Sequence, residues 1–550
     1  MRVRAGLAKT SVSVFEPGMA MLGWGRPDHV PTEVAHPLHA RALVVERDGR
    51  RLAYVVADLC FVAAALRKGV IDELARRGAA VAPGDLMLTA THTHAGPNGF
   101  SHAFFYDLSA LGFSRRVFDG WVHGIADAVE AAIERLEPAM LSLGEARVEG
   151  DVIRNRSLDA HRENPDATAD GADRTLLALR VDDARGRALG VVSFFALHAT
   201  SIHGDTPVLH PDHKGLAAAS FEAWAREAGH ASHFVALFAQ GAAGDVSPNV
   251  RFDRARGVMV GAREDDEASA RFVAEAQLEA TRRAFEGAAR LAEGPLDARA
   301  RRVDLEERFV PPRLAGGAPA RTTRGRLGLA MAAGTAEGPG PLAGLPLPRK
   351  LGAADPKVPL LAIGPKVRRR LFARIDPRRL PPWLDPAFDH ARRSGGLDHA
   401  WIPTVLPVQV MRLGPLLLAA LPNEPTTTVG HRLRARLEAA LGPGARVHVQ
   451  GYANAYAGYL TTPEEYRRQR YEGAYTLFGP HTLGAFTEVL EGLVAGLRGA
   501  PVEVEGPPLQ VLSAAELATR TFTRTRRPAR YRRGDAEPPP TAAARTPPRP

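Results

Sequence analysis

The feature that most constrains this sequence is a recurring local design, in which a short apolar run stops abruptly in a polar, glycine-rich or histidine-rich loop. Such runs are typical of strands covered on both faces of a sheet, and helical patterns lie between them. The sequence therefore predicts an α/β fold, a layered mixed β-sheet with flanking helices, whose site lies at the carboxyl ends of strands. The predicted strands span residues 52–57, 86–90, 191–197, 234–239, 416–421 and 447–450, and the predicted helices span 119–136, 215–228 and 427–441. A capping box predicts a further helix start at Thr462.

The net charge of +10 is distributed unevenly along the chain. Residues 301–380 carry 17 Lys and Arg against 6 Asp and Glu, and residues 520–550 carry 9 Arg against 2 acidic residues. The remainder is mildly acidic, with 45 basic and 53 acidic residues. A nucleic-acid-binding protein would show aromatic residues among its basic ones and a recognisable binding module. The sequence shows neither, so we expect no nucleic acid partner.

The chain has 550 residues, which is too long for one ordinary core and indicates several structural units or one elaborate domain. We expect a main domain over 1–506, in which 311–380 form a basic, Pro- and Gly-rich insertion, and an extension over 507–550 without an immunoglobulin-like domain. Within this extension, we expect residues 520–550 to form a disordered basic tail. One cysteine and no recognisable signal peptide or spanning segment predict a cytoplasmic protein.

Histidines and a carboxylate follow three different predicted strands. His92 and His94 lie in Thr-His-Thr-His-Ala-Gly-Pro at 91–97, His198 follows another strand, and Glu424 follows a third. Two imidazoles and one carboxylate with an open position form the ligand set of a catalytic zinc site. Hydrogen-bonded loop histidines are the alternative, because spacing alone does not show that these residues converge.

The loop Gly-Asp-Val-Ser-Pro-Asn at 244–249 presents the hydroxyl of Ser247. It is not the nucleophile elbow of serine hydrolases, because Asp245 and Asn249 stand where that motif has glycine. The pattern alone favours a Ser-Pro turn. Five tyrosines further along are compatible with simple packing, namely Tyr452, Tyr456, Tyr459, Tyr466 and Tyr471.

In combination, these motifs resemble the neutral/alkaline (non-lysosomal) ceramidase family. The resemblance covers roughly residues 4–500 in the family's order and is strongest at 452–483, with Thr-Thr-Pro-Glu-Glu-Tyr, Gln-Arg-Tyr-Glu-Gly-Ala and Gly-Pro-His-Thr-Leu. The other matching stretches are 91–97, Asn-Arg-Ser at 155–157, His-Ala-Thr-Ser at 198–201, 244–249 and Ala-Ala-Gly-Thr-Ala-Glu-Gly-Pro-Gly at 332–340.

The resemblance implies one zinc ion per chain, held by His92, His198, Glu424 and Tyr459. It implies hydrolysis of the amide bond of ceramide, or of a related N-acyl lipid, to a fatty acid and a free amine. The alternative is an amidohydrolase of the same fold that acts on a non-sphingolipid N-acyl amide.

Four further residues match the family's essential serine and the residues that line its site: Ser247, His94, Arg156 and Tyr471. His94 is then a general acid or base, and Arg156 and Tyr471 donate to the developing oxyanion. Water activated by zinc is the preferred nucleophile, and Ser247 ranks second.

The sequence departs from the family pattern after His198, where His203, His210 and His213 are additional histidines. We expect these histidines to be solvated or to support the ligands, in preference to forming a second metal site. This difference also leaves open which amide is the true substrate.

Residues 365–384 interleave Lys and Arg with apolar side chains at near-helical spacing. Such a segment can bind peripherally to an anionic membrane surface where an acyl-amide lipid resides. A basic, solvated helix packed on the domain is an equal alternative.

Overall fold

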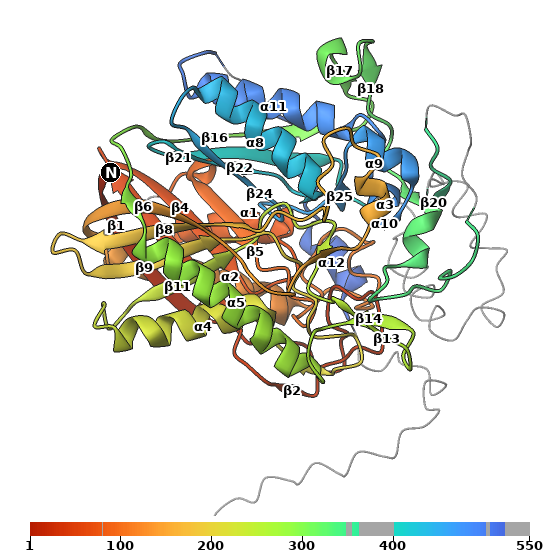
Figure 1. Ribbon diagram of the computed structural model, residues 1–550, viewed down its shortest axis with the longest axis horizontal. Coiled ribbons are helices and arrows are strands. Elements are labelled where there is room, and N and C mark those ends of the chain that lie inside the picture. The colour runs from red at the N-terminus through yellow and green to blue at the C-terminus, as the bar shows by residue number, and fades with distance from the viewer. Residues whose placement is uncertain (80, 348–354, 362–400, 502–505, 523–550) are drawn as a thin grey trace, which may run out of the picture.

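The computed structural model describes residues 1–79, 81–347, 355–361, 401–501 and 506–522. The amphipathic segment at 365–384 and the tail beyond residue 522 lie outside the described residues. Figure 1 shows two stacked sheets with helices on their outer sides. The predicted α/β fold with a layered mixed sheet and flanking helices is confirmed.

The larger sheet is antiparallel in its middle and parallel at both edges. Each parallel edge comes from a strand–helix–strand crossover. One runs through α1 (Ala64–Arg76) between β4 (Arg50–Ala57) and β5 (Leu86–Ala90), and the other runs through α4 (Asp212–Glu227) between β9 (Ala188–Phe194) and β11 (Val235–Ala239). Loops at the carboxyl ends of these strands therefore lead into the interior. In sheet order the strands are β11 (Val235–Ala239), β9 (Ala188–Phe194), β8 (Thr175–Asp183), β6 (Glu137–Arg147), β1 (Arg2–Ser11), β3 (His39–Arg47), β4 (Arg50–Ala57) and β5 (Leu86–Ala90), and β15 (Ala289–Arg290) pairs with β6.

The smaller sheet packs face to face on the larger one. Leu43 and Leu237 of the larger sheet share an apolar core with Met411 and Leu418 of the smaller sheet. Because both faces of each sheet are covered, the central stretches such as β5, β9, β11 and β22 (Leu416–Ala420) are buried along their length. The smaller sheet contains β16 (Leu296–Asp304), β21 (Val405–Leu413), β22 (Leu416–Ala420) and β24 (Arg446–Gln450), covered by α8 (Thr427–Leu441) and α11 (Thr482–Gly496), while α2 (Arg115–Glu134), α4 and α5 (Asp266–Glu286) cover the larger sheet.

Most predicted ends lie within two residues of the observed ones, but α2 and α4 begin four and three residues earlier than predicted, at Arg115 and Asp212. The strand at 86–90, the helix at 427–441 and the capping box of α9 (Pro463–Arg468) are confirmed. The strand predicted at 191–197 ends at Phe194 instead. There the Phe195 carbonyl accepts a hydrogen bond from Lys214 Nζ at 2.8 Å, so the remaining apolar residues are buried in a loop.

Parts of the predicted insertion and extension pack on the body. Within 311–347 the side chains of Leu327 and Glu337 are buried. In the extension, α12 (Ala514–Arg520) is anchored because Phe113 N donates to the Arg520 carbonyl at 2.8 Å and Phe522 N donates to the Phe113 carbonyl at 2.9 Å. Packed chain thus continues to Phe522, beyond the predicted start of the disordered tail. The boundary at 506 stays a prediction.

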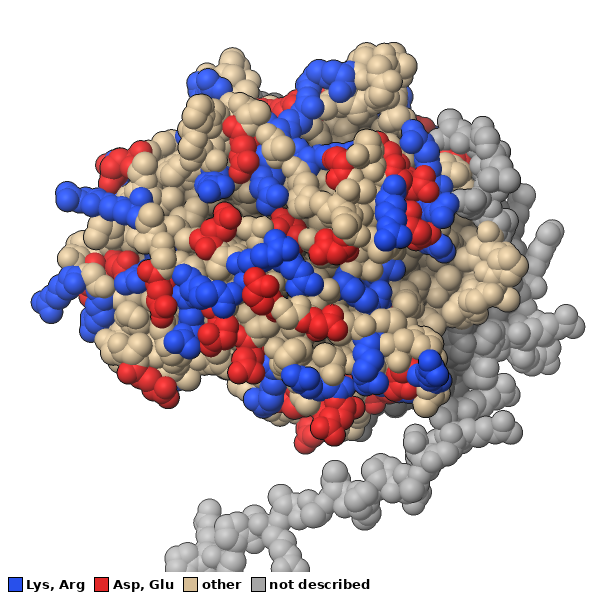
Figure 2. All heavy atoms as spheres, viewed as in Figure 1, with Lys and Arg blue, Asp and Glu red and all other residues tan. Residues whose placement is uncertain are grey.

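The surface in Figure 2 has basic and acidic side chains interspersed, with no large area of one sign on that face. Within the described ranges, no helix combines the length and apolar character that crossing a bilayer requires.

Candidate functional site

Two loops from the larger sheet carry the predicted histidine ligands. His92 lies two residues after the end of β5, and His198 lies four residues after the end of β9. A backbone bridge between Thr93 and Ala199 joins the two loops. His92 has a φ of 68°, in the left-handed region that a histidine rarely occupies, so the loop holds it in an unusual conformation.

The other two predicted ligands come from the side of the smaller sheet. Glu424 begins β23 (Glu424–Pro425), which pairs in parallel with β25 (Tyr459–Leu460), and the register sets Glu424 opposite Tyr459. This pairing is the local reason that Tyr459, rather than a neighbouring tyrosine, approaches His198.

The four side chains converge in the interior. His92 Nε2 lies 3.1 Å from His198 Nε2, and Glu424 Oε2 lies 3.4 Å from the first and 3.2 Å from the second. The Tyr459 hydroxyl lies 3.3 Å from His198 Nε2. All four residues are buried. The structure therefore brings together all four residues that the resemblance indicates as metal ligands.

The hydrogen bonds on the far side of each imidazole fix its tautomer. His92 Nδ1 contacts the Cys60 carbonyl at 2.5 Å, and His198 Nδ1 contacts the Ala243 carbonyl at 2.7 Å. A carbonyl only accepts, so both Nδ1 atoms carry hydrogen and both Nε2 atoms face one another. The Nε2 lone pairs of His92 and His198 and the carboxylate of Glu424 therefore surround one point. Two imidazole nitrogens and a carboxylate are suitable donors for a cation.

The spacing of the donors fits a small cation. Ligands at about 2.0–2.1 Å from a tetrahedral zinc ion lie about 3.3 Å from each other, close to the separations seen among His92, His198 and Glu424. These three residues can hold a metal ion.

The close approach of these side chains shifts their pKa values in opposite directions. Burial opposes the charged form of His92, but the Glu424 carboxylate outweighs burial and raises the pKa of His92 to about 10. Burial, with Arg156 nearby, lowers the pKa of His198 to about 4. Burial opposes ionisation of Glu424, yet His92 and His198 hold its pKa well below the ordinary value.

Two tyrosines that sequence reasoning did not single out as functional hold the carboxylate. The Tyr452 hydroxyl donates to Glu424 Oε2 at 3.3 Å, and the Tyr456 hydroxyl donates to Glu424 Oε1. Both rings are buried. Their clustering next to Tyr459 in the sequence is the only signal that marks them.

His94 stands beside the ligand cluster. Its Nε2 lies 3.1 Å from His92 Nε2, and its buried Nδ1 has no hydrogen-bond partner among the described residues. Gly23 packs so tightly on the ring that a Cβ there would lie 2.4 Å from it. Burial and the nearby His92 hold the pKa of His94 well below its ordinary value, so without metal it is neutral near pH 7.

Arg156 and Tyr471 lie on the Tyr459 side of the cluster. Arg156 Nη2 donates to the Tyr459 hydroxyl at 2.7 Å and to the Gly244 carbonyl at 2.9 Å. The Tyr471 ring packs edge-on against Tyr459 with their centroids 5.4 Å apart. Arg156 therefore contacts a ligand residue directly, and Tyr471 contacts its ring.

Ser247 is buried on β12 (Val246–Ser247), which pairs with β7 (Arg154–Asn155). Its Oγ accepts a hydrogen bond from Asn249 N at 3.1 Å. Across the part of the chain that the structure describes, no base is hydrogen-bonded to this hydroxyl.

Each additional histidine makes at least one hydrogen bond within the described protein. His203 contacts Asp266 at 2.8 Å through Nδ1 and stacks on Trp24, with ring centroids 5.6 Å apart. His213 contacts the His198 carbonyl at 2.8 Å through Nε2, while its Nδ1 accepts from Gln277 Nε2 at 2.8 Å.

His210 lies near His36 and Glu267, a group that could hold a metal ion. Its Nδ1, however, accepts a hydrogen bond from Asp212 N at 2.8 Å, so Nε2 carries the hydrogen and donates it to Glu267 at 2.7 Å. With its Nε2 protonated, His210 has no lone pair facing Glu267. The hydrogen bonds therefore favour a supporting role for His210 over a second metal site.

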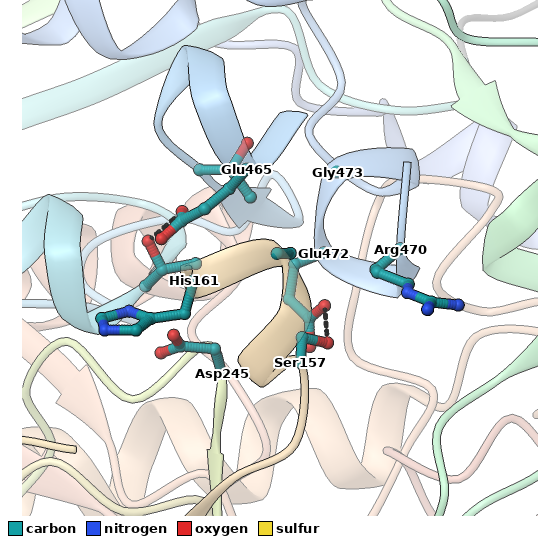
Figure 3. A pocket seen from close by; sticks show the side chains of 10 residues that line it. Ser157, His161, Asp245, Glu465, Arg470, Glu472 and Gly473 are labelled. Carbon is teal, nitrogen blue, oxygen red and sulfur yellow. Dashed lines mark hydrogen bonds between the residues drawn. The ribbon is translucent and has the colours of Figure 1, made fainter. Parts of the chain in front are cut away.

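A small polar pocket lies behind the loop of Ser247 (Figure 3). It is lined by Asp245, Glu465 and His161, which the figure shows in its wall. Asp245 Oδ1 accepts from Thr427 N at 2.7 Å and thereby caps α8. Burial and the neighbouring Glu465 raise the pKa of Asp245 to about 7. The folded protein thus holds a proton here that the unfolded chain releases above about pH 4.

This proton predicts a pH-dependent stability. Folding favours the protonated carboxyl, so the stability that Asp245 contributes is complete below about pH 4 and is lost as pH rises through about 7. We expect Asp245→Asn to unfold at a lower temperature but to lose much of this pH dependence. Melting temperatures measured by circular dichroism across that range check it. A variant that keeps the wild-type slope would contradict the prediction.

Comparison with known proteins identifies the family of this chain. The sequence matches the family described as neutral/alkaline non-lysosomal ceramidase, N-terminal, over residues 4–354 and 390–488. The neutral ceramidase of Pseudomonas aeruginosa is 35% identical over 513 residues, which cover 91% of this chain and 73% of that protein. The neutral ceramidase of Mycobacterium tuberculosis is 33% identical over 535 residues, which cover 92% of this chain and 79% of that protein.

A solved structure, described as a ceramidase complexed with C2, superposes with a TM-score of 0.79 at 34% identity and covers 94% of this chain and 78% of that chain. The crystal structure of neutral ceramidase from Pseudomonas aeruginosa gives a TM-score of 0.76 at 32% identity and covers 92% and 76%. With sequence, fold and a buried His–His–Glu cluster in agreement, this chain belongs to the neutral/alkaline non-lysosomal ceramidase family.

Proposed function

We propose that this chain hydrolyses the amide bond of ceramide, or of a closely related N-acyl lipid, to a fatty acid and a free amine, with one zinc ion as cofactor. The observation that carries the proposal is the buried convergence of His92, His198 and Glu424 in a chain that is similar to ceramidases over nine-tenths of its length. His92, His198, Glu424 and Tyr459 would hold the zinc. When bound, zinc supplies Lewis-acid polarisation of a carbonyl and activation of water near neutral pH.

The residues around the ligands have distinct proposed roles. His94 exchanges a proton with substrate or water at Nδ1, the nitrogen that the described protein leaves without a partner. Tyr471 donates its hydroxyl hydrogen to the developing oxyanion. Arg156 stabilises that charge less directly, because its donors reach protein oxygens, among them the Tyr459 hydroxyl.

Water is the preferred nucleophile over Ser247. An activated serine needs a base within hydrogen-bond reach, and the hydrogen bond of Ser247 Oγ comes from the Asn249 backbone. Ser247 is therefore proposed to bind substrate through its hydroxyl, and the covalent route ranks second.

A non-sphingolipid N-acyl amide is the second candidate substrate. The observation that favours it is His203, which stacks on Trp24, whose ring packs edge-on against His94 with centroids 5.2 Å apart. His203 departs from the family pattern at this point of the chain. Peripheral contact of residues 365–384 with anionic membranes stays a prediction.

Incubation of the purified protein with ceramide and with simpler N-acyl amides, with and without a chelator, tests the function. We expect ceramide to be cleaved to fatty acid and amine, the chelator to abolish cleavage, and added zinc to restore it. Cleavage of the simple amides alone favours the second candidate. A zinc-loaded protein that cleaves no amide would overturn both.

A further inference from the structure

Glu337 lies in the predicted insertion, far in sequence from every residue of the site, yet it reaches the site's interior. The segment after η3 (Leu329–Ala333) forms a tight turn in which Thr335 N donates to the Gly338 carbonyl at 3.0 Å. Gly334 has a φ of 70°, and a Cβ there would lie 2.2 Å from the Gly338 carbonyl oxygen. The turn therefore requires glycine, and it presents the Glu337 carboxylate inward, 4% exposed.

The two oxygens of this carboxylate bind two different arginines. Glu337 Oε1 accepts from Arg156 Nη1 at 3.1 Å, and Oε2 accepts from Arg154 Nη2 at 3.0 Å. On the opposite side of the Arg156 guanidinium, Nε donates to Glu472 Oε1 at 2.9 Å. The other oxygen of Glu472 accepts from Ser157 Oγ at 2.7 Å, as the dashed line in Figure 3 shows.

This double clamp determines where the remaining arm of Arg156 points. A guanidinium is planar, so fixing Nε and Nη1 also fixes Nη2. Nη2 then donates to the Gly244 carbonyl and, at 2.7 Å, to the Tyr459 hydroxyl. Arg156 cannot leave Tyr459 without breaking a buried ion pair and leaving a buried charge unpaired.

The clamp also balances charge near a cation site. The buried guanidinium of Arg156 and the half-buried one of Arg154 face two buried carboxylates, those of Glu337 and Glu472. Loss of the Glu337 charge leaves a surplus positive charge beside a guanidinium that touches a ligand residue. Both orientation and charge then act against cation binding in the same direction.

We propose that Glu337 is a positioning residue for the metal site, which clamps Arg156 so that Arg156 orients the hydroxyl of Tyr459 toward the ligand cluster. The inference rests on the proposed zinc site. Its distinguishing consequence is that Glu337 affects zinc binding mainly through the Tyr459 hydroxyl, with the balance of charge as the smaller contribution.

Zinc dissociation constants of the full chain, measured by competition with a chromogenic chelator, test this. We expect Glu337→Gln to bind zinc about tenfold more weakly, as is usual when a residue supporting a ligand is lost. Glu337→Asp keeps the charge and should recover most of the affinity. In a Tyr459→Phe background, Glu337→Gln should cause a clearly smaller further loss, because the hydroxyl through which it mainly acts is gone and only the effect of charge remains.

Glu222→Gln is the matched control, since Glu222 is an equally buried carboxylate that pairs with Lys9 on the far part of α4. It should lower the melting temperature without changing zinc affinity. Wild-type affinity in Glu337→Gln, or an equal loss with and without the Tyr459 hydroxyl, would overturn the inference while leaving the zinc site in place. A wild-type chain that binds no zinc would overturn the site and the inference together.

Discussion

A His92→Ala protein should contain no zinc after purification and should lose at least about a thousandfold in kcat/KM for amide cleavage. His92 supplies one of two imidazole nitrogens that lie 3.1 Å apart, with Glu424 beside both, so its removal leaves a single imidazole in the donor set and weakens zinc binding strongly. Metal polarisation lowers a barrier by several kcal/mol, and about 4 kcal/mol corresponds to this loss. Metal analysis and initial rates on ceramide measure both effects.

Two further variants separate loss of the ligand from loss of the fold. His92→Asn suits the left-handed backbone at φ 68°, which asparagine tolerates better than alanine, and should lose zinc in the same way. His102→Ala removes an imidazole that accepts from Leu512 N in another part of the molecule, and it should keep zinc and activity. A His92→Ala protein with full amidase activity would refute the proposed site.

The parts of the fold that depend on local pattern could be predicted from the sequence. The apolar run at 86–90 and the helix at 427–441 have their predicted ends, because continuous burial and local stop signals determine them. The strand predicted to end at residue 197 ends three residues earlier, at Phe194. Burial looks the same in a strand and in a buried loop whose carbonyls are satisfied by a side chain, here by Lys214.

Some residues of the site could likewise be predicted from residue pattern and others could not. His92, His198 and Glu424 could be proposed from residue type and position after strands, and the structure brings them together. Tyr459 could not be chosen from residue pattern among five tyrosines, because its place depends on the register between β23 and β25, two short strands 35 residues apart in sequence. Only the family resemblance indicated it.

The contact of Glu337 with Arg156 could not be predicted from the sequence for the same reason. The segment of Glu337 resembles the family's pattern and also reads as a Pro- and Gly-rich loop, and nothing local shows that a carboxylate there meets Arg156. Contacts between distant segments are decided by packing of the whole chain, so single positions carry no signal for them.

The affinity of the protein for zinc should depend steeply on pH. Without metal, Glu424 raises the pKa of His92 to about 10, so near neutral pH the nitrogen that binds zinc carries a proton. Zinc must displace that proton, and the apparent affinity should fall about tenfold for each pH unit below about 10. His198, with a pKa of about 4, adds nothing to this slope near neutral pH.

Proton release measured with a pH indicator, as zinc is added to the metal-free protein at about pH 8, gives the stoichiometry directly. At least about one proton should appear per zinc bound. Histidine labelled with carbon-13 should show a His92 signal that stays in the imidazolium form well above the usual pKa of about 6.5 and changes on zinc binding, with His92→Asn identifying it. Zinc binding without proton release would mean that Glu424 does not hold a proton on His92 in the metal-free protein.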